Sequence, residues 1–167
     1  MASISSPRLC LDRDCVSLMV NYLLDLYRIQ LYEYNRMIKN YGVYLKPMHI
    51  VVKKSATGLK TYYYFGRYWY RIETVNSRVK WIYLGSRKPF ENIPDPPINP
   101  ILLISIEKSD ANAKTVCIHN ESFAELSEQI SRIVSAFSVC CKNLDRASEE
   151  EIIACVSKRF EEYNEHS

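Results

Sequence analysis

The residues best suited to chemistry lie between Lys46 and Lys88, where aromatic rings alternate with cationic side chains. The stretch TYYYFGRYWYRIE, residues 61–73, places seven aromatic rings in the nine positions from 62 to 70 and includes two arginines. Guanidinium and ammonium groups neutralise phosphates and release their counterions. Exposed rings stack on nucleobases or wedge between them. This combination predicts contact with a nucleic acid.

The charge of the 167-residue chain is distributed unevenly, although the formal net charge is only +3. Residues 46–88 contain ten Lys or Arg against one acid, Glu73. Residues 89–167 contain seven basic and fourteen acidic residues, and the first 45 residues add +1. Such an asymmetry is typical of a basic surface that meets a polyanion.

Side-chain alternation along a strand predicts which groups of residues 61–73 share a face. One face carries Tyr62, Tyr64, Tyr68, Tyr70 and Ile72, and the other carries Tyr63, Phe65, Arg67, Trp69, Arg71 and Glu73. Because burial of an unpaired arginine is costly, we expect the tyrosine face to be core. Trp69, between two arginines, is then the exposed ring that meets the ligand. A bulge at Gly66 would swap the two faces on one side of it.

The candidate binding surface extends onto the neighbouring segments. Arg78 and Lys80 align with Arg67 and Arg71 if residues 78–84 form the adjacent strand. The full candidate set is Lys53, Lys54, Arg67, Trp69, Arg71, Arg78, Lys80, Arg87 and Lys88. We expect DNA in preference to RNA, while single and double strands are not distinguished.

Two other interpretations of the aromatic segment remain open. Tyr, Trp and Arg are also favoured in protein interfaces, so the chain is alternatively an interaction subunit of a larger archaeal or viral assembly. Arginine over an aromatic ring is also a common structural contact that needs no ligand.

Sequence motifs of enzymes are missing. His49 and His119 are not followed by Arg at the His-x-x-Arg spacing of a tyrosine recombinase, and Glu107 directly precedes Lys108, unlike the Glu-x-Lys of a metal-dependent nuclease. The P-loop, GxGxxG and GxSxG patterns do not occur. We therefore expect a non-catalytic protein without a cofactor, although a ribonuclease site of His, Tyr and Arg has no motif by which to exclude it.

Six cysteines stand at positions 10, 15, 117, 140, 141 and 155, without a C-x-x-C pair or a histidine at zinc-ligand spacing. We expect reduced thiols that pack as small hydrophobes, and no metal site. A Cys10–Cys15 bridge is the open alternative if the source is a hyperthermophile.

The N-terminus and the hydropathy pattern bear on the compartment. The segment MASISSPRLCLDRDC carries charges where a signal peptide is apolar. No run approaches the roughly 18 apolar residues of a membrane span. We expect a cytoplasmic chain that does not enter a membrane.

The elements that must position these residues predict an α+β fold. A long helix capped by Asp12 or Asp14 runs to about residue 40, and strands over 48–54, 61–73 and 78–84 form an antiparallel three-stranded meander. A proline-rich connector, 89–100, precedes a second hairpin of 101–108 and 114–119. Two C-terminal helices follow, one capped by Asn120 or Ser122 and one by Ser148. We expect three segments, 1–88, 89–100 and 101–167, within one compact domain.

The long helix is apolar over a wide arc. Leu18, Tyr22, Leu26 and Ile29 line one side, and Met19, Leu23, Tyr27, Leu31, Tyr34 and Ile38 spread over others. Such a helix contacts more than one surface. Either its own domain covers it on several sides, or a second copy of the chain does, which would make a homodimer.

The segment TYYYFGRYWYRIETVNSRVKWIYLG, about residues 61–85, resembles a tyrosine-rich basic hairpin of small uncharacterised archaeal proteins and of proteins of archaeal mobile elements. The shared form is Tyr-Tyr-Tyr, a turn, and Lys-x-x-Tyr-Leu/Ile-Gly. The resemblance implies a thermophilic archaeal or viral source, and it carries over no activity and no catalytic residue.

Overall fold

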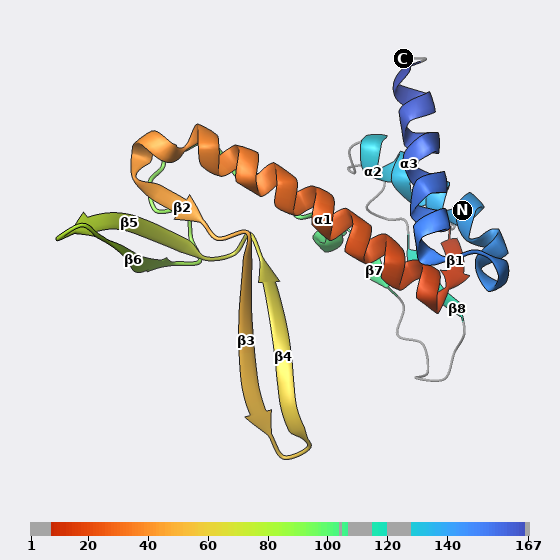
Figure 1. The fold of residues 1–167 in the computed structure, drawn as a ribbon, viewed down its shortest axis with the longest axis horizontal. Helices are drawn as coiled ribbons and strands as arrows, with labels where there is room; N and C mark the ends of the chain where they lie inside the picture. The colour runs from red at the N-terminus through yellow and green to blue at the C-terminus, as the bar shows by residue number, and fades with distance from the viewer. Residues whose placement is uncertain (1–7, 104, 107–114, 120–127, 166–167) are drawn as a thin grey trace, which may run out of the picture. The chain divides into compact units, whose positions relative to one another are not determined.

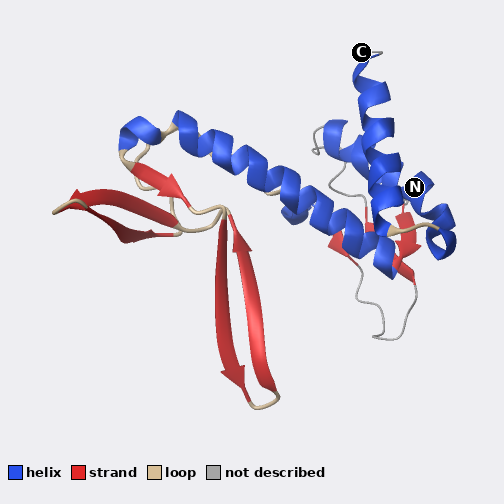
Figure 2. Cartoon of the chain, in the orientation of Figure 1, coloured by secondary structure: helices blue, strands red, loops and turns tan. Residues whose placement is uncertain are grey.

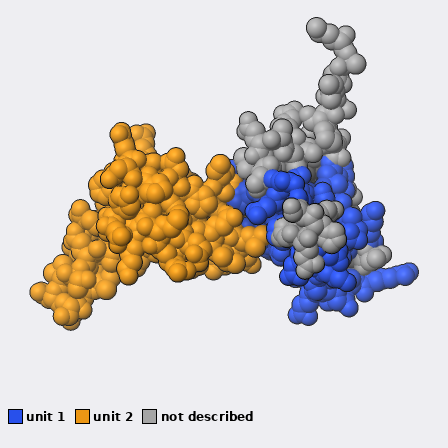
Figure 3. Space-filling model, turned by 90° about the horizontal axis from the view of Figure 1, so that it is seen from above, with its two compact units in different colours: residues 1–23, 100–167 blue, residues 24–99 orange. Residues whose placement is uncertain are grey.

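The computed structural model describes residues 8–103, 105–106, 115–119 and 128–165, and its fold is α+β as predicted (Figures 1 and 2). The chain divides into two compact units: residues 1–23 together with 100–167, and residues 24–99 (Figure 3). The unit of residues 24–99 contains the whole basic segment, residues 46–88. None of the described helices combines the length and the apolarity needed to cross a membrane.

Within the described residues, seven strands lie between the long first helix and the two C-terminal helices. The elements in chain order are β1 (Arg8–Asp12), α1 (Arg13–Met37), β2 (Val43–Leu45), β3 (Met48–Ser55), β4 (Gly58–Phe65), β5 (Trp69–Val75), β6 (Arg78–Gly85), β7 (Ser105–Ile106), β8 (Thr115–His119), α2 (Glu128–Cys140) and α3 (Glu149–Glu165). Short 3₁₀ turns lie at Lys39–Tyr41, Pro100–Leu103 and Cys141–Arg146.

The unit of residues 1–23 and 100–167 combines a small antiparallel sheet, in the order β1-β8-β7, with the start of α1 and with α2 and α3. Of the predicted second hairpin, β7 and β8 pair antiparallel, but the predicted strand over 101–108 is wrong at its start, because Pro100–Leu103 form a 3₁₀ turn. Strand β1 was not predicted. Two of the expected helix caps are confirmed. Asp12 accepts the backbone N–H of Asp14 at 2.9 Å, and Ser148 and Glu151 form a reciprocal capping box. The expected cap at Asn120 or Ser122 lies outside the described residues.

The prediction of reduced cysteines is wrong, because all six are paired in this unit. The disulfides are Cys10–Cys117, Cys15–Cys141 and Cys140–Cys155. The Cys10–Cys15 alternative is also wrong, since Cys10 lies directly opposite Cys117 in the β1–β8 ladder. The partners of two bridges are more than 100 residues apart in sequence, so only the unpredicted β1–β8 pairing and the packing of α1 on α2 bring them together.

The unit of residues 24–99 is built around the second half of α1. One stripe of that helix is buried and packs on β2 and β5; the core residues are Tyr27, Leu31, Tyr34, Ile38, Val43, Leu45, Trp69 and Ile93. The Asn35 side chain completes the edge of β2: its amide donates to the Leu45 carbonyl at 2.7 Å, and its Oδ1 accepts the Leu45 N–H at 2.8 Å. This pair of bonds fixes the strand to the helix.

The proline-rich segment has neither helix nor strand between residues 86 and 99, as predicted. It is held on α1 by specific contacts. The Tyr34 hydroxyl donates to the Pro94 carbonyl at 2.6 Å, and Ile93 is buried in the core. The Lys88 ammonium bonds the Ile93 carbonyl at 3.1 Å and Asp95 at 2.5 Å. The segment is therefore an ordered part of this unit.

The expected three-stranded meander is divided into two separate sheets. Residues 61–73 are not one strand: β4 ends at Phe65, and β5 begins at Trp69. Strands β3 and β4 form a two-stranded hairpin, while β5 and β6 form a sheet with β2 in the order β2-β5-β6. Figure 1 shows the two hairpins diverging from a common junction at the end of β2.

Candidate nucleic-acid interface

The inward and outward faces of the aromatic segment are the opposite of the prediction on both sides of the break between β4 and β5. Gly66 has a φ of +55°, which L side chains rarely adopt, and its N–H bonds the Pro47 carbonyl at 3.2 Å. The alternation is nevertheless kept across the break, because Phe65 and Trp69 both pack on the α1 core while Tyr64, Tyr68 and Tyr70 lie together on the other side. The alternative of a face swap on one side of Gly66 is therefore wrong.

The prediction that Trp69 is the exposed ring is consequently wrong. Trp69 is 3% exposed and meets Tyr34 edge to face, with ring centroids 6.2 Å apart. The prediction of a buried tyrosine face also fails: Tyr62 is 40% exposed, and Tyr64, Tyr68 and Tyr70 are only partly buried. The physical reason is that Trp69 pairs with Leu45 of β2, whose side chain belongs to the α1 core.

Seven rings that are partly or largely exposed form a connected cluster at the junction of the two hairpins, which we call the aromatic corner. Its members are Tyr44, His49, Tyr64, Tyr68, Tyr70, Trp81 and Tyr83, each within 6.0 Å of another ring of the set, centroid to centroid. Most pairs meet edge to face, which is the preferred geometry of aromatic contacts. Trp81 and Tyr83 are more than half exposed.

The two hairpins contribute to one hollow in this corner. His49 of β3, Tyr70 of β5, Tyr83 of β6 and the connecting Tyr68 line a depression of about 320 Å³. The depression is walled by rings, and its volume is of the size that small ligands occupy.

Two cations lie directly over the rings of the corner. Lys46 Nζ is 5.6 Å from the centroid of the Tyr70 ring and 3.3 Å from His49 Nδ1, which must be the acceptor because an ammonium only donates. The Arg67 guanidinium is 5.1 Å from the Tyr64 ring and 5.6 Å from the Tyr68 ring. These contacts hold the cations in place, and Arg67 remains exposed.

The aromatic corner contains no acidic residue. The only acid among residues 46–88 is Glu73, and it alternates with Tyr70 and Ile72 on β5, so it lies on the opposite face of the sheet. There it accepts an ion pair from Arg71 at 2.9 Å. The positive charges of the corner are thus not neutralised locally.

The β3–β4 hairpin continues the basic surface away from the corner. Lys53 and Lys60 are directly opposite each other in its ladder, and Lys53 Nζ lies 5.6 Å from the centroid of the Tyr62 ring. Alternation places these three residues on the same face as His49 and Tyr64 of the corner. Lys54 lies on the other face of the hairpin.

The structure therefore brings together only some of the predicted site residues. Arg67 and Lys53 lie with exposed rings, but Arg71, Arg78 and Lys80 occupy the opposite face of the β5–β6 hairpin. Arg87 is exposed in the loop after β6.

Lys88 and Trp69 are structural. The Lys88 side chain is only 29% exposed and is held by Asp95 and the loop carbonyl of Ile93.

Sequence reasoning missed several members of the corner. Trp81 and Tyr83 share a face of β6 with Val79, and that face is solvent-exposed. Lys46 and Tyr44 were not singled out as site residues. The sequence signal for Tyr44 is the short segment Val43–Leu45. Val43 and Leu45 are apolar and alternate with Tyr44, so this tyrosine faces away from the core.

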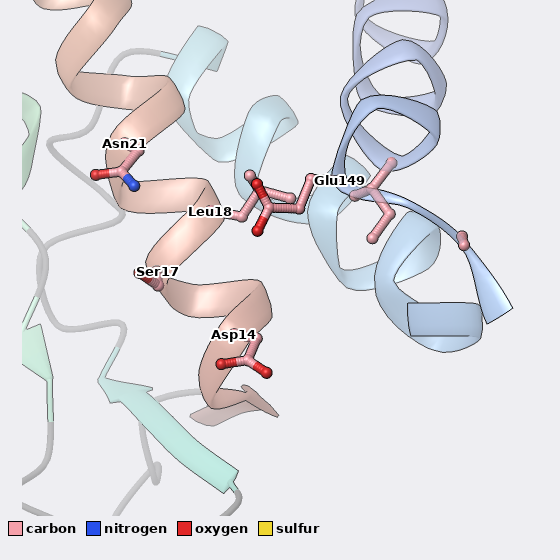
Figure 4. Close-up of a pocket in the computed structure, with 7 residues that line it drawn as sticks. Asp14, Ser17, Leu18, Asn21 and Glu149 are labelled. Carbon is pink, nitrogen blue, oxygen red and sulfur yellow. The ribbon is translucent and has the colours of Figure 1, made fainter. Parts of the chain in front are cut away.

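A second depression lies in the unit of residues 1–23 and 100–167. It has a volume of about 320 Å³, and its polar side chains include Asp14, Ser17 and Asn21 of α1 and Glu149 at the start of α3 (Figure 4). Two carboxylates make a poor cation site. Within the described parts of the chain, no three His, Cys, Asp or Glu side chains are grouped to hold a metal ion.

Burial affects the pKa values of three tyrosines in the unit of residues 24–99. Burial raises the pKa of Tyr27, and burial together with the charge of Asp95 raises the pKa of Tyr34 to about 12. Burial, with a contribution from Tyr32, raises the pKa of Tyr44. These phenols are neutral hydrogen-bond donors at physiological pH.

No protein-family model, curated protein or solved structure matches this chain.

Proposed function

We propose that the protein binds nucleic acid, with DNA preferred over RNA, through the aromatic corner and the adjoining lysine face of β3–β4. The observation that carries this proposal is a cluster of partly exposed rings with cations held over it and without an acid on the same face. Rings provide stacking surfaces that accept any base, and the cations neutralise phosphates. The role is binding, without a catalytic step.

The distribution of charge on the β5–β6 hairpin supports a binding role over a purely structural one. Glu73 is paired with Arg71 on the opposite face, whereas the side chains of Lys46 and Arg67 contact aromatic rings and His49. A structural cation–π pair needs a single ring. Here the Arg67 guanidinium lies over two rings, Tyr64 and Tyr68, and both are partly exposed.

A binding assay tests the proposal directly. Fluorescence anisotropy with labelled single- and double-stranded DNA and RNA should detect binding that weakens steeply as salt rises. Replacing Arg67 by Gln should flatten the slope of log affinity against log salt by about one unit if the guanidinium contacts a phosphate. Lys39→Gln, a charge-matched change in an exposed 3₁₀ turn outside both hairpins, should leave the slope unchanged. Absence of binding to all four ligands would refute the proposal.

The second candidate function is a protein interface. It is favoured by the exposed apolar side chains of β3–β4, since Ile50, Val52, Leu59 and Tyr63 are all about half exposed or more. A partner bound through such a face should be insensitive to salt, which separates the two functions in one titration.

We also propose that α1 can form a homodimer contact. Ile29, Tyr32 and Met37 are 59%, 51% and 66% exposed on a helix whose other side is buried. Light scattering across a concentration series tests it: the mass should double, and Ile29→Glu should restore the mass of a single 19.5 kDa chain.

The disulfides bear on the compartment and the source. Intracellular proteins of hyperthermophilic archaea are rich in disulfides, so three bridges are compatible with a cytoplasmic protein from such an organism or its mobile elements, which is the location we propose. Thermal unfolding tests this proposal. The melting temperature of the oxidised protein should lie above roughly 90 °C, the range of hyperstable proteins.

A further inference from the structure

We propose that the β3–β4 hairpin is a two-stranded ribbon that enters the major groove of double-stranded DNA. This inference rests on the proposed nucleic-acid binding and names its ligand. The hairpin is paired without interruption from Met48 opposite Phe65 to Ser55 opposite Gly58. Strands of eight residues extend about 26 Å at the usual rise. Figure 1 shows the hairpin standing apart from the β2-β5-β6 sheet.

The hairpin is unusually exposed for its composition. Within residues 24–99, all of which are described, β3 and β4 pair only with each other, and their middle and tip are exposed on both faces. An isolated two-stranded hairpin is at best marginally stable in water. An occupant that covers one of its faces would therefore also stabilise it.

The charges of the ribbon select a polyanion as that occupant. Lys53 and Lys60 are direct cross-strand partners, Lys54 is adjacent, and residues 48–65 contain no acid. Like charges directly opposite each other destabilise a strand pair. A row of phosphates alongside the ribbon would convert this repulsion into attraction, whereas an apolar protein surface would bury the charges at a cost.

The side chains on the Lys53 face suit the groove floor and its walls. Lys53, Lys60, Tyr62 and His49 carry ammonium, hydroxyl and ring N–H donors, and guanine presents N7 and O6 acceptors in the major groove. The same face ends at the aromatic corner, so DNA that follows the ribbon reaches Tyr64 and Arg67 next.

The shape of the ribbon distinguishes duplex DNA from other nucleic acids. The major groove of B-form DNA is about 12 Å wide and admits a two-stranded ribbon. The major groove of duplex RNA is too deep and narrow for side chains to read, and a single strand has no groove. A binder that used only stacking and phosphate contacts would not make this distinction.

The first experiment compares four labelled ligands of one sequence by anisotropy. They are duplex DNA, the same duplex with glucosylated 5-hydroxymethylcytosine in place of cytosine, duplex RNA, and single-stranded DNA. Glucose on the cytosine ring fills the major groove, so binding to the modified duplex should weaken by roughly tenfold or more, the cost of one or two lost base-edge contacts. Duplex RNA and single-stranded DNA should bind more weakly than unmodified duplex DNA.

The possible results separate this inference from the proposed function. Equal affinity for modified and unmodified duplex overturns the major-groove placement while nucleic-acid binding stands. Tighter binding to single strands does the same. If none of the four ligands binds, the proposed function itself fails.

The second experiment changes the ribbon. Lys53→Gln/Lys60→Gln should flatten the slope of log affinity against log salt by about two units and remove the preference for unmodified duplex. The change eliminates a like-charge pair, so circular dichroism and the melting temperature should be retained. Lys39→Gln/Lys158→Gln, which removes the same charge from exposed positions outside the hairpins, should keep both the slope and the preference. A double ribbon variant that binds all duplexes as the parent does would overturn the inference.

Discussion

Gly66 lies directly against the ring of Tyr27: a Cβ built on Gly66 would stand 2.2 Å from the Tyr27 hydroxyl oxygen. This close approach places the break between β4 and β5 on the core helix. Phe65 before the break and Trp69 after it both pack on the same core.

Gly66→Ala should therefore destabilise the unit of residues 24–99 by more than backbone strain alone. The matched control is Gly42→Ala, whose φ is also positive, +68°, but whose Cβ would meet no atom within 4 Å. The control should cost about 1 kcal/mol in free energy of unfolding, as expected for Ala in the left-handed region. Gly66→Ala should cost about 1–3 kcal/mol more, from overpacking, as measured by urea unfolding.

A second substitution checks the cause. Tyr27→Phe removes the hydroxyl oxygen that the new methyl would meet, so combining it with Gly66→Ala should cost less than the sum of the single changes. Equal losses for Gly66→Ala and Gly42→Ala would show that the Tyr27 contact is not what excludes a side chain at residue 66.

The fold class was predictable because it depends on local signals. Caps at Asp12 and Ser148, the proline-rich segment, and strand-rich runs each act over a few residues. Alternation correctly grouped Tyr64, Tyr68 and Tyr70 on one side. The inward face was not predictable from the cost of burying arginine, because Arg71 is paired with Glu73 and Arg67 lies over two rings, so neither arginine is buried without a partner.

The prediction of reduced cysteines failed for a related reason. Spacing along the chain says nothing of a bridge such as Cys10–Cys117, which is formed by a strand pairing at a sequence separation of 107. The candidate site was predicted in composition, since Arg67 and Lys53 do lie beside exposed rings, but the face was assigned to the wrong side of β5.

Titration of thiols tests the disulfide assignment. The denatured, unreduced protein should contain no thiol that reacts with a thiol reagent. Reduction should release six thiols per chain. Peptide mapping should recover the three bridges. Two or more reactive thiols before reduction would contradict the complete pairing.

Reduction should affect the two units differently, since no cysteine lies in residues 24–99. Loss of a native disulfide typically costs 2–5 kcal/mol, so the unit of residues 1–23 and 100–167 should melt at a lower temperature. Both tryptophans lie in residues 24–99, so their fluorescence reports on that unit alone and should change little. A parallel loss of tryptophan fluorescence and of helical circular dichroism would show that the units unfold together.

The Tyr34 phenol should make stability fall at alkaline pH. Its pKa in the folded protein is raised from 10.0 to about 12, so its contribution is complete below pH 10 and is lost as pH rises to about 12. Two pKa units correspond to about 3 kcal/mol in free energy of unfolding. Urea unfolding at intervals across this range measures the slope.

Tyr34→Phe is the control for that titration. It should cost about 1 kcal/mol at neutral pH, through loss of the hydrogen bond to the Pro94 carbonyl, and should flatten the alkaline decline. Some decline should remain, because burial also raises the pKa of Tyr27. An unchanged slope in the variant would mean that Tyr34 does not titrate in this range.

The two tryptophans provide the sharpest separation of stability from binding. Trp69 is 3% exposed in the α1 core, so Trp69→Ala should cost about 3–5 kcal/mol in free energy of unfolding, as truncation of a buried aromatic does. Trp81 is 51% exposed in the aromatic corner, so Trp81→Ala should lower the melting temperature only slightly. If the Trp81 ring stacks on a base, its loss should weaken binding by roughly 1–3 kcal/mol.

Binding and melting are therefore measured on both variants, with Trp81→Phe as a third that keeps a stacking ring. Trp81→Phe should recover most of the affinity that Trp81→Ala loses, because every aromatic ring offers a face to a base. Full affinity in Trp81→Ala would exclude Trp81 as a contact. A stable Trp69→Ala with impaired binding would mean that the ring which meets the ligand is Trp69, and that the phase of β5 is the reverse of the one the structure gives.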